Sequence, residues 1–209
     1  MVNRIAVDEL RIVGGNLALD FANTQSGPPG GEPDVESLAG YEDLVAWALR
    51  VGVVGTRDAD DLVRHARRHP RDAEAAFERA TALRDRVFTI FASIADDAPP
   101  PADALARLRD DDAEALAHAD LAARAGGFAW TWSRPGDLDG LRWPIVHAAA
   151  TLLTGGPLER VKACGGCRDL FLDETKNGSR RWCSMAECGT RAKMRRFVAR
   201  RSAARSRAT

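Results

Sequence analysis

The chain has 209 residues, which is long enough for one domain of about 150 residues and a small appended module. Its 45% hydrophobic and 29% charged residues are typical of a soluble globular protein, and charges interrupt every apolar run well before the roughly 18 residues that cross a bilayer. The first 19 residues carry four charges and no continuous apolar stretch. We therefore expect no secretory signal peptide, a cytoplasmic location and no membrane partner.

The formal net charge of zero is the sum of two oppositely charged segments. Residues 159–209 contain 14 Lys or Arg and 5 Asp or Glu, a net charge of +9, so the preceding 158 residues carry −9. Asymmetry of this kind is typical of a module that binds a polyanion. Gly155-Gly156-Pro157 marks a break, and we predict a domain over residues 1–158 followed by a basic module over 159–209.

Apolar spacing predicts that the N-terminal domain is mostly helical. Residues 10–24 contain a strand-like piece, a break at Gly14-Gly15 and a helical turn, and the proline- and glycine-rich residues 25–36 are expected to form a loop. Helical periodicity predicts helices over 41–51, 56–69 with Thr56 as N-cap, 71–96, 102–110 and 142–154. Alternating residues on either side of Gly126-Gly127 predict a β-hairpin over 117–133, with Phe128, Trp130 and Trp132 on one face.

All four cysteines of the chain lie in the basic module, as two close pairs. Loops of two and four intervening residues bring four soft donors onto one tetrahedral ion, with metal–sulfur distances of about 2.3 Å. A redox pair would leave the second pair unexplained, and two disulfides would need an oxidising compartment. Iron also accepts four thiolates. We predict a closed structural zinc site with the ligands Cys164, Cys167, Cys183 and Cys188.

The rest of the basic module is predicted to form a treble-clef-like finger. The first cysteine pair forms a knuckle, residues 170–173 and 180–183 form two strands around a turn at Asn177-Gly178, and a helix begins at Cys188 and runs towards Arg205. About fifty residues bury little apolar surface, so the metal is expected to supply much of the stability, and its removal to disorder the C-terminal part. The expected fold class is α+β, mostly α, with a small antiparallel sheet before this finger.

The C-terminal helix carries many cations and almost no acid. Met194, Phe197 and Val198 share one stripe that is expected to pack onto the finger hairpin. Glu187 is the only carboxylate after Glu174, which favours a nucleic-acid contact over a merely solvated face. The candidate DNA-binding residues are Arg180, Arg181, Arg191, Lys193, Arg195, Arg196 and Arg200.

The motif Cys-x-x-Cys, Leu170-Phe171-x-Asp173, Arg181-Trp182-Cys183-Ser184-Met185-x-x-Cys188-Gly189-x-Arg191-x-Lys193 resembles the CGNR zinc-finger family of bacterial proteins. Gly14-Gly15-Asn16-Leu17-Ala18-Leu19-Asp20-Phe21-Ala22-Asn23-Thr24 resembles the start of the ABATE domain that precedes that finger. The two segments together extend over nearly the whole chain. The family is regarded as stress-induced transcription regulators, so the resemblance implies DNA binding and regulation.

The chain departs from the family tetrad at Thr190, where the family has Asn, so the motif reads Cys-Gly-Thr-Arg. Both side chains can accept a hydrogen bond from a backbone amide at a helix start, so a capping role could survive the exchange. An asparagine that reads a base edge would not be replaced equivalently by Thr190. Arg191, the fourth position, is retained.

Two further groups of polar residues lie in the N-terminal domain. Asp20, Asn23 and Thr24 follow the Gly-Gly break and could line a pocket for a small-molecule effector; the alternative is that they cap and tie down a helix end. His147 is expected to be a satisfied histidine on a helix. No phosphate-binding glycine loop and no catalytic constellation can be defended, so we expect no enzyme.

The leading interpretation is a transcription regulator that binds double-stranded DNA through its zinc finger, with an N-terminal domain that senses a ligand or forms a homodimer. The alternative is an RNA- or protein-interaction module in which zinc is purely architectural. A third hypothesis places an enzyme in the acidic domain, although nothing in the sequence names its chemistry. The homodimer rests only on the analogy with bacterial regulators that bind palindromic sites.

Overall fold

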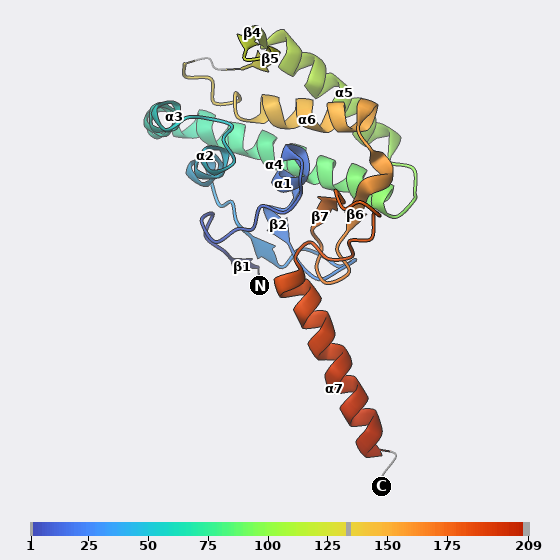
Figure 1. Ribbon diagram of the computed structural model, residues 1–209. Helices are drawn as coiled ribbons and strands as arrows, with labels where there is room; N and C mark the ends of the chain where they lie inside the picture. The colour runs from blue at the N-terminus through green and yellow to red at the C-terminus, as the bar shows by residue number, and fades with distance from the viewer. Residues whose placement is uncertain (1, 133–134, 207–209) are drawn as a thin grey trace.

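One long helix, α4 (Pro70–Ala95), lies across the centre of the molecule (Figure 1). Its side chains Leu83, Val87, Ile90 and Phe91 recur at helical spacing and are at most 1% exposed. Five other helices contact it, so α4 forms the middle of the apolar core. The structure is a computed structural model that describes residues 2–132 and 135–206, with side chains as far as residue 201.

The helices around α4 agree in number and order with the helical segments expected from sequence. They are α1 (Leu17–Ala22), α2 (Tyr41–Arg50), α3 (Thr56–Arg68), α5 (Ala102–Ala117) and α6 (Arg142–Gly155). The expected N-cap of α3 is wrong, because Gly55 takes that position and Thr56 is the first helical residue. The described part of the chain is 53% helical, as expected for the fold class.

Helix α5 is longer than predicted and continues beyond Asp110. The predicted helix ended at Asp110, within a run of three aspartates. Instead, Asp111 forms ion pairs with Arg86 and Arg142, and Asp112 contacts His147 Nδ1 at 3.0 Å. These contacts with α4 and α6 keep the acidic turn inside the helix. His147 has a hydrogen-bond partner in Asp112, as expected from sequence.

Short strands occupy both ends of the segment predicted to be a loop, residues 25–36. Strand β3 (Val35–Glu36) lies between β1 (Asn3–Arg4), which is parallel to it, and β2 (Gln25–Ser26), which is antiparallel. Glu36 also accepts two hydrogen bonds from the buried Arg84 of α4, at 2.8 and 2.9 Å. The small sheet is therefore fixed to the central helix.

The predicted β-hairpin in the second half of the domain is confirmed. It consists of β4 (Asp120–Arg124) and β5 (Gly127–Thr131), which pair in antiparallel register with Leu121 opposite Trp130. Phe128 and Trp130 are exposed, whereas the indole N–H of Trp132 donates to the Ala115 carbonyl at 2.8 Å. Only the base of the predicted aromatic face is thus fixed against the helices.

The finger follows a short 3₁₀ turn (Leu158–Arg160). Its strands β6 (Val161–Ala163) and β7 (Leu170–Leu172) form an antiparallel hairpin, and a π-helical turn (Met185–Gly189) leads into α7 (Thr190–Ser206). The predicted pairing of residues 170–173 with 180–183 is wrong, because β7 pairs with β6 and residues 180–183 form no strand. A knuckle in a hairpin followed by a helix is nevertheless the treble-clef-like arrangement expected.

The finger packs directly onto the N-terminal domain. Val161 and Leu170 belong to the same apolar core as α4, and the backbone N–H of Leu172 donates to the Gly14 carbonyl at 2.7 Å. A second backbone bond joins Arg168 N–H to the Gly27 carbonyl at 2.9 Å. The predicted division at 158/159 therefore does not separate two independent cores.

Candidate metal centre and nucleic-acid interface

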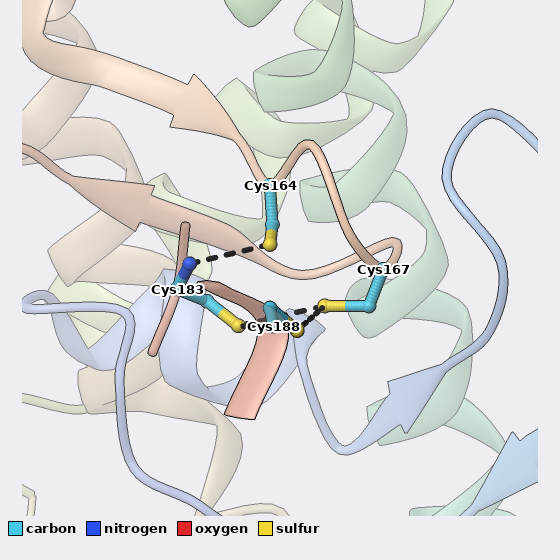
Figure 2. A group of neighbouring side chains, drawn as sticks. All are labelled: Cys164, Cys167, Cys183 and Cys188. Atoms are coloured by element: carbon cyan, nitrogen blue, oxygen red, sulfur yellow. Dashed lines mark hydrogen bonds between the residues drawn. The ribbon is translucent and has the colours of Figure 1, made fainter. Parts of the chain in front are cut away.

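Four sulfur atoms converge at the junction of the finger hairpin and α7 (Figure 2). Cys164 and Cys167 come from the loop between β6 and β7, Cys183 precedes the π-helical turn, and Cys188 lies within it. All four side chains are buried. Two loops and one helical turn thus supply donors to one point.

The sulfur separations fit one tetrahedral ion. Cys167, Cys183 and Cys188 Sγ atoms lie 3.5, 3.6 and 3.7 Å apart, and all four Sγ atoms lie within 4.8 Å of one another. A tetrahedron with metal–sulfur bonds of about 2.3 Å has edges of about 3.8 Å, whereas a disulfide requires about 2.05 Å. The donor set suits zinc or iron, and it leaves no coordination position for a substrate.

Two glycines of the knuckle allow the second cysteine pair to approach. A Cβ atom on Gly166 would lie 2.9 Å from Cys188 Cβ, and one on Gly165 would lie 2.9 Å from the Trp182 ring. Both distances are shorter than carbon atoms tolerate. Gly166 therefore allows the close approach of Cys188, whereas a side chain at Gly165 would meet the far end of the Trp182 ring.

Hydrogen bonds distinguish Cys164 from the other cysteines. The thiols of Cys167 and Cys183 lower its pKa, and the backbone N–H groups of Cys183 and Gly166 donate to its sulfur at 3.2 and 3.4 Å. The pKa values of Cys167 and Cys183 are raised, chiefly by their interaction with the Cys164 sulfur. A cation that binds all four sulfurs must therefore displace protons.

Arg11 of the N-terminal domain reaches the metal centre, which sequence analysis did not foresee. Its guanidinium donates to Cys183 Sγ at 3.6 Å and pairs with Asp169 at 3.3 Å and Glu187 at 3.1 Å. Burial lowers the pKa of Arg11, but the negative groups outweigh this effect and raise it. Arg191 also donates to Cys188 Sγ, at 3.4 Å. Two cations thus offset the charge of the thiolates.

Asp173 organises the loop that leads to the second cysteine pair. Its buried carboxylate accepts hydrogen bonds from Lys162 Nζ at 2.7 Å, from Thr175 Oγ1 at 2.6 Å and from the Arg180 backbone N–H at 2.8 Å. Burial raises the pKa of Asp173, but these donors outweigh it and hold the pKa below its ordinary value. The aspartate of the family motif is therefore a structural centre of the finger.

The predicted DNA-binding residues fall into two groups. The Arg180 guanidinium lies 4.3 Å from the Phe171 ring centroid and donates to the carbonyls of Trp182, Cys183 and Val13. These contacts turn the Arg180 side chain towards the finger, which it helps to hold together, and its contact with DNA stays a prediction. Arg181, Arg191, Lys193, Arg195, Arg196 and Arg200 are exposed.

The apolar stripe of α7 does not pack onto the hairpin, and that expectation is wrong. Met194, Phe197 and Val198 are 58%, 54% and 57% exposed. Figure 1 shows the reason: α7 extends away from the rest of the molecule from its first turn onwards. Helical periodicity reports a shared face but cannot report whether a neighbouring element covers that face.

Thr190, the position that departs from the family tetrad, is the first residue of α7. Its hydroxyl donates to the Met185 carbonyl at 3.2 Å, across the π-helical turn. The N-cap of that turn is Ser184, whose hydroxyl accepts the Glu187 backbone N–H at 3.3 Å. Ser184 is therefore the capping residue, and Thr190, which stands where the family has Asn, bonds to a backbone carbonyl instead.

Asp20, Asn23 and Thr24 are buried, and their contacts tie segments together. Asp20 accepts the Gly14 backbone N–H at 2.7 Å; burial raises the pKa of Asp20, and this backbone bond opposes the rise. Thr24 donates to the Phe21 carbonyl at 2.7 Å, and Asn23 bonds to the finger backbone. These contacts match the interpretation in which the three residues tie down a helix end, and not the one in which they line an effector pocket.

No helix among residues 2–132 and 135–206 combines the length and hydropathy that a bilayer crossing needs.

Comparison with protein families matches residues 15–156 to the ABATE family, described as "Putative stress-induced transcription regulator". Residues 160–201 match the CGNR zinc finger. Comparison with curated proteins finds no match. With its four convergent cysteines and a family match over most of its length, the chain belongs to the ABATE family and carries a CGNR zinc finger at its C-terminal end.

Proposed function

We propose that this protein is a zinc-dependent transcription regulator that binds double-stranded DNA through α7 and the exposed cations at its base. The observation that carries the proposal is the isolation of α7. Its side chains from Arg191 to Arg201 include six Lys or Arg and no carboxylate, and they project from a helix that stands away from the acidic domain. Such a surface needs a polyanionic partner.

The dimensions of α7 suit a DNA groove. Its 17 residues span about 25 Å, and the major groove is about 12 Å wide and admits one α-helix. Cations occupy several sides of α7, so they can reach phosphates on both walls of the groove. Arg181 beside Trp182, at 5.7 Å from the ring centroid, extends this surface to the base of the helix.

In this proposal zinc would have a structural role. Held by Cys164, Cys167, Cys183 and Cys188, it would supply a fixed tetrahedral link between the knuckle and the start of α7. Four protein ligands leave it no open position, and we therefore propose a non-enzymatic role. Metal analysis of the purified chain distinguishes zinc from iron.

The test is duplex binding by the full chain, because the finger shares its core with the N-terminal domain. Fluorescence anisotropy should show an affinity that falls steeply with salt. Arg195→Ala with Arg196→Ala should weaken binding and reduce the salt slope by about one unit per lost phosphate contact, while Arg57→Ala with Arg71→Ala should change neither. No duplex binding at low salt refutes the proposal, and equal competition by single-stranded RNA favours the RNA-binding alternative.

For the N-terminal domain we propose a sensing role at a cavity other than the one expected. A cavity of about 570 Å³ lies between the α2–α3 loop, strand β5 and the start of α6. Leu62, Trp132 and Leu141 contribute to its lining, and its volume is within the range of small-molecule sites. Anilinonaphthalene sulfonate, an anionic fluorescent probe of apolar surfaces, should bind there.

Filling the cavity tests this role. Leu62→Trp should reduce probe binding, whereas Leu49→Trp on the exposed side of α2 should not. Equal probe binding by the native chain and the Leu62→Trp variant contradicts the assignment.

A further inference from the structure

The exposed stripe of α7 is not accounted for by contacts with DNA phosphates. Phosphates neutralise cations, but they offer no apolar surface to Met194, Phe197 and Val198, each more than half exposed. A helix with adjoining apolar and cationic surfaces is the type that docks into an apolar groove with an acidic rim. A groove of this type lies on the N-terminal domain.

This groove lies between the first turns of α2 and α4 and the end of α3, with a volume of about 740 Å³. Ala66, Ala73 and Phe77 give it an apolar floor. Four carboxylates and one cation contribute to its lining: Glu42, Asp43, Glu74, Glu78 and Arg67. We call it the α2–α4 groove.

The carboxylates of the α2–α4 groove are not equally available. Glu42 accepts two hydrogen bonds from Arg67, both at 2.8 Å, and Asp43 pairs with Arg4 at 3.1 Å. Glu74 and Glu78 are exposed, and within the described part of the chain neither has an ion pair. They lie four residues apart on α4 and so present two like charges on one helix face.

The helix and the groove of one molecule cannot meet. Helix α7 is continuous from Thr190 and points away from its own body, whereas the groove lies at the α2 and α3 end of the N-terminal domain. Two α7 helices are also poor partners for each other, since all of their charged side chains among the described residues are cations and repel one another. A second molecule can supply the groove that α7 lacks.

We propose that α7 of one molecule docks in the α2–α4 groove of a second molecule. Phe197 and Met194 then cover the floor at Phe77 and Ala73, and arginines of α7 pair with Glu74 and Glu78. The +9 and −9 segments of the chain provide the charge complementarity. Two molecules that exchange helices close into a dimer, and duplex DNA competes with this association for the same helix.

Sedimentation velocity of the full metal-loaded chain tests the proposal. Association should rise with protein concentration and fall with salt. Glu74→Lys with Glu78→Lys should weaken it at least about tenfold, because attraction becomes repulsion. The matched control, Glu9→Lys with Asp60→Lys, reverses two exposed charges outside the groove and should leave association unchanged.

A charge exchange gives the sharper result. Arg195→Glu with Arg196→Glu should also weaken association, and mixing this variant with the groove variant should restore heterologous pairs. A native chain that stays monomeric at every concentration, or a groove variant that associates like the native chain, overturns the proposal. Duplex binding by the groove variant separates the two proposals, because it survives there if α7 binds DNA and self-association alone is lost.

Discussion

Asn23 holds Leu170 by two hydrogen bonds across 147 positions of sequence. Its side-chain amide donates to the Leu170 carbonyl and its amide oxygen accepts the Leu170 backbone N–H, both at 2.8 Å. Both residues are buried, with Asn23 3% and Leu170 0% exposed. The pair extends hydrogen bonding from α1 to the outer edge of β7, so the finger hairpin depends on the N-terminal domain.

Asn23→Ala is expected to destabilise the chain by about 1–3 kcal/mol for each backbone group left unsatisfied. Urea unfolding followed by circular dichroism gives the change in free energy of unfolding. Asn177→Ala, in the exposed turn of the finger, is the matched control. Equal stability of the two variants would show that water replaces the lost bonds.

Metal removal should loosen only part of the finger. Because Val161 and Leu170 share the core of α4, we expect β6 and β7 to keep slow amide exchange after chelation. Backbone amides of residues 183–189 should exchange faster, since the metal bound to the four cysteines links this segment to the knuckle. Hydrogen exchange with and without chelator measures this; loss of protection throughout β6 and β7 contradicts it.

Metal affinity should fall as pH falls. The pKa values of Cys167 and Cys183 are raised in the metal-free cluster, so protons compete with the cation throughout the neutral and acidic range. Competition with a chromophoric chelator at several pH values measures the slope. A pH-independent affinity would mean that the cluster is already ionised before the metal binds.

Arg11→Gln should release the metal about tenfold faster than the native chain does. A tetrathiolate zinc site carries a charge of about −2, and the Arg11 guanidinium contacts Cys183 Sγ at 3.6 Å. Transfer of zinc to an indicator dye gives the rate. Arg4→Gln removes an exposed guanidinium paired with Asp43 and should leave the rate unchanged.

Asp173→Asn should destabilise the finger at neutral pH and less in acid. The folded pKa of Asp173 lies below its ordinary value, so its stabilisation is present above the ordinary pKa of about 3.9 and is lost as pH falls through the folded value. Urea midpoints of both proteins should therefore converge at low pH. A constant difference at all pH values would exclude the carboxylate charge as the cause.

The helices and the metal ligands were predictable because each depends on local spacing. The apolar residues of α4 recur along one stripe, and the cysteine pairs bring their own geometry. The partner of β7 was not predictable from Asn177-Gly178, since a turn signal does not reveal whether the flanking segments pair. The contact between Arg11 and Cys183 was equally unpredictable, because the two residues are 172 positions apart and no local sequence pattern indicates it.

The inward-turned Arg180 shows a related limit of charge counting. Sequence places Arg180 and Arg181 side by side, yet one contacts the Phe171 ring and the other is exposed. Only three-dimensional packing separates a cation that stabilises the finger from one that is available to a partner.

Helix α7 is attached to the rest of the described chain at its N-terminal end. It leaves the metal centre at Cys188, and beyond the buried Ala192 of its first turn it extends away from the rest of the described chain. Over a length of about 25 Å, a tilt of about 10° at the N-terminal end of α7 moves its far end by about 4 Å. This displacement is larger than the 3.4 Å rise of one base pair. Small adjustments where Arg11 and Asp169 meet the second cysteine pair would thus become large displacements at the tip.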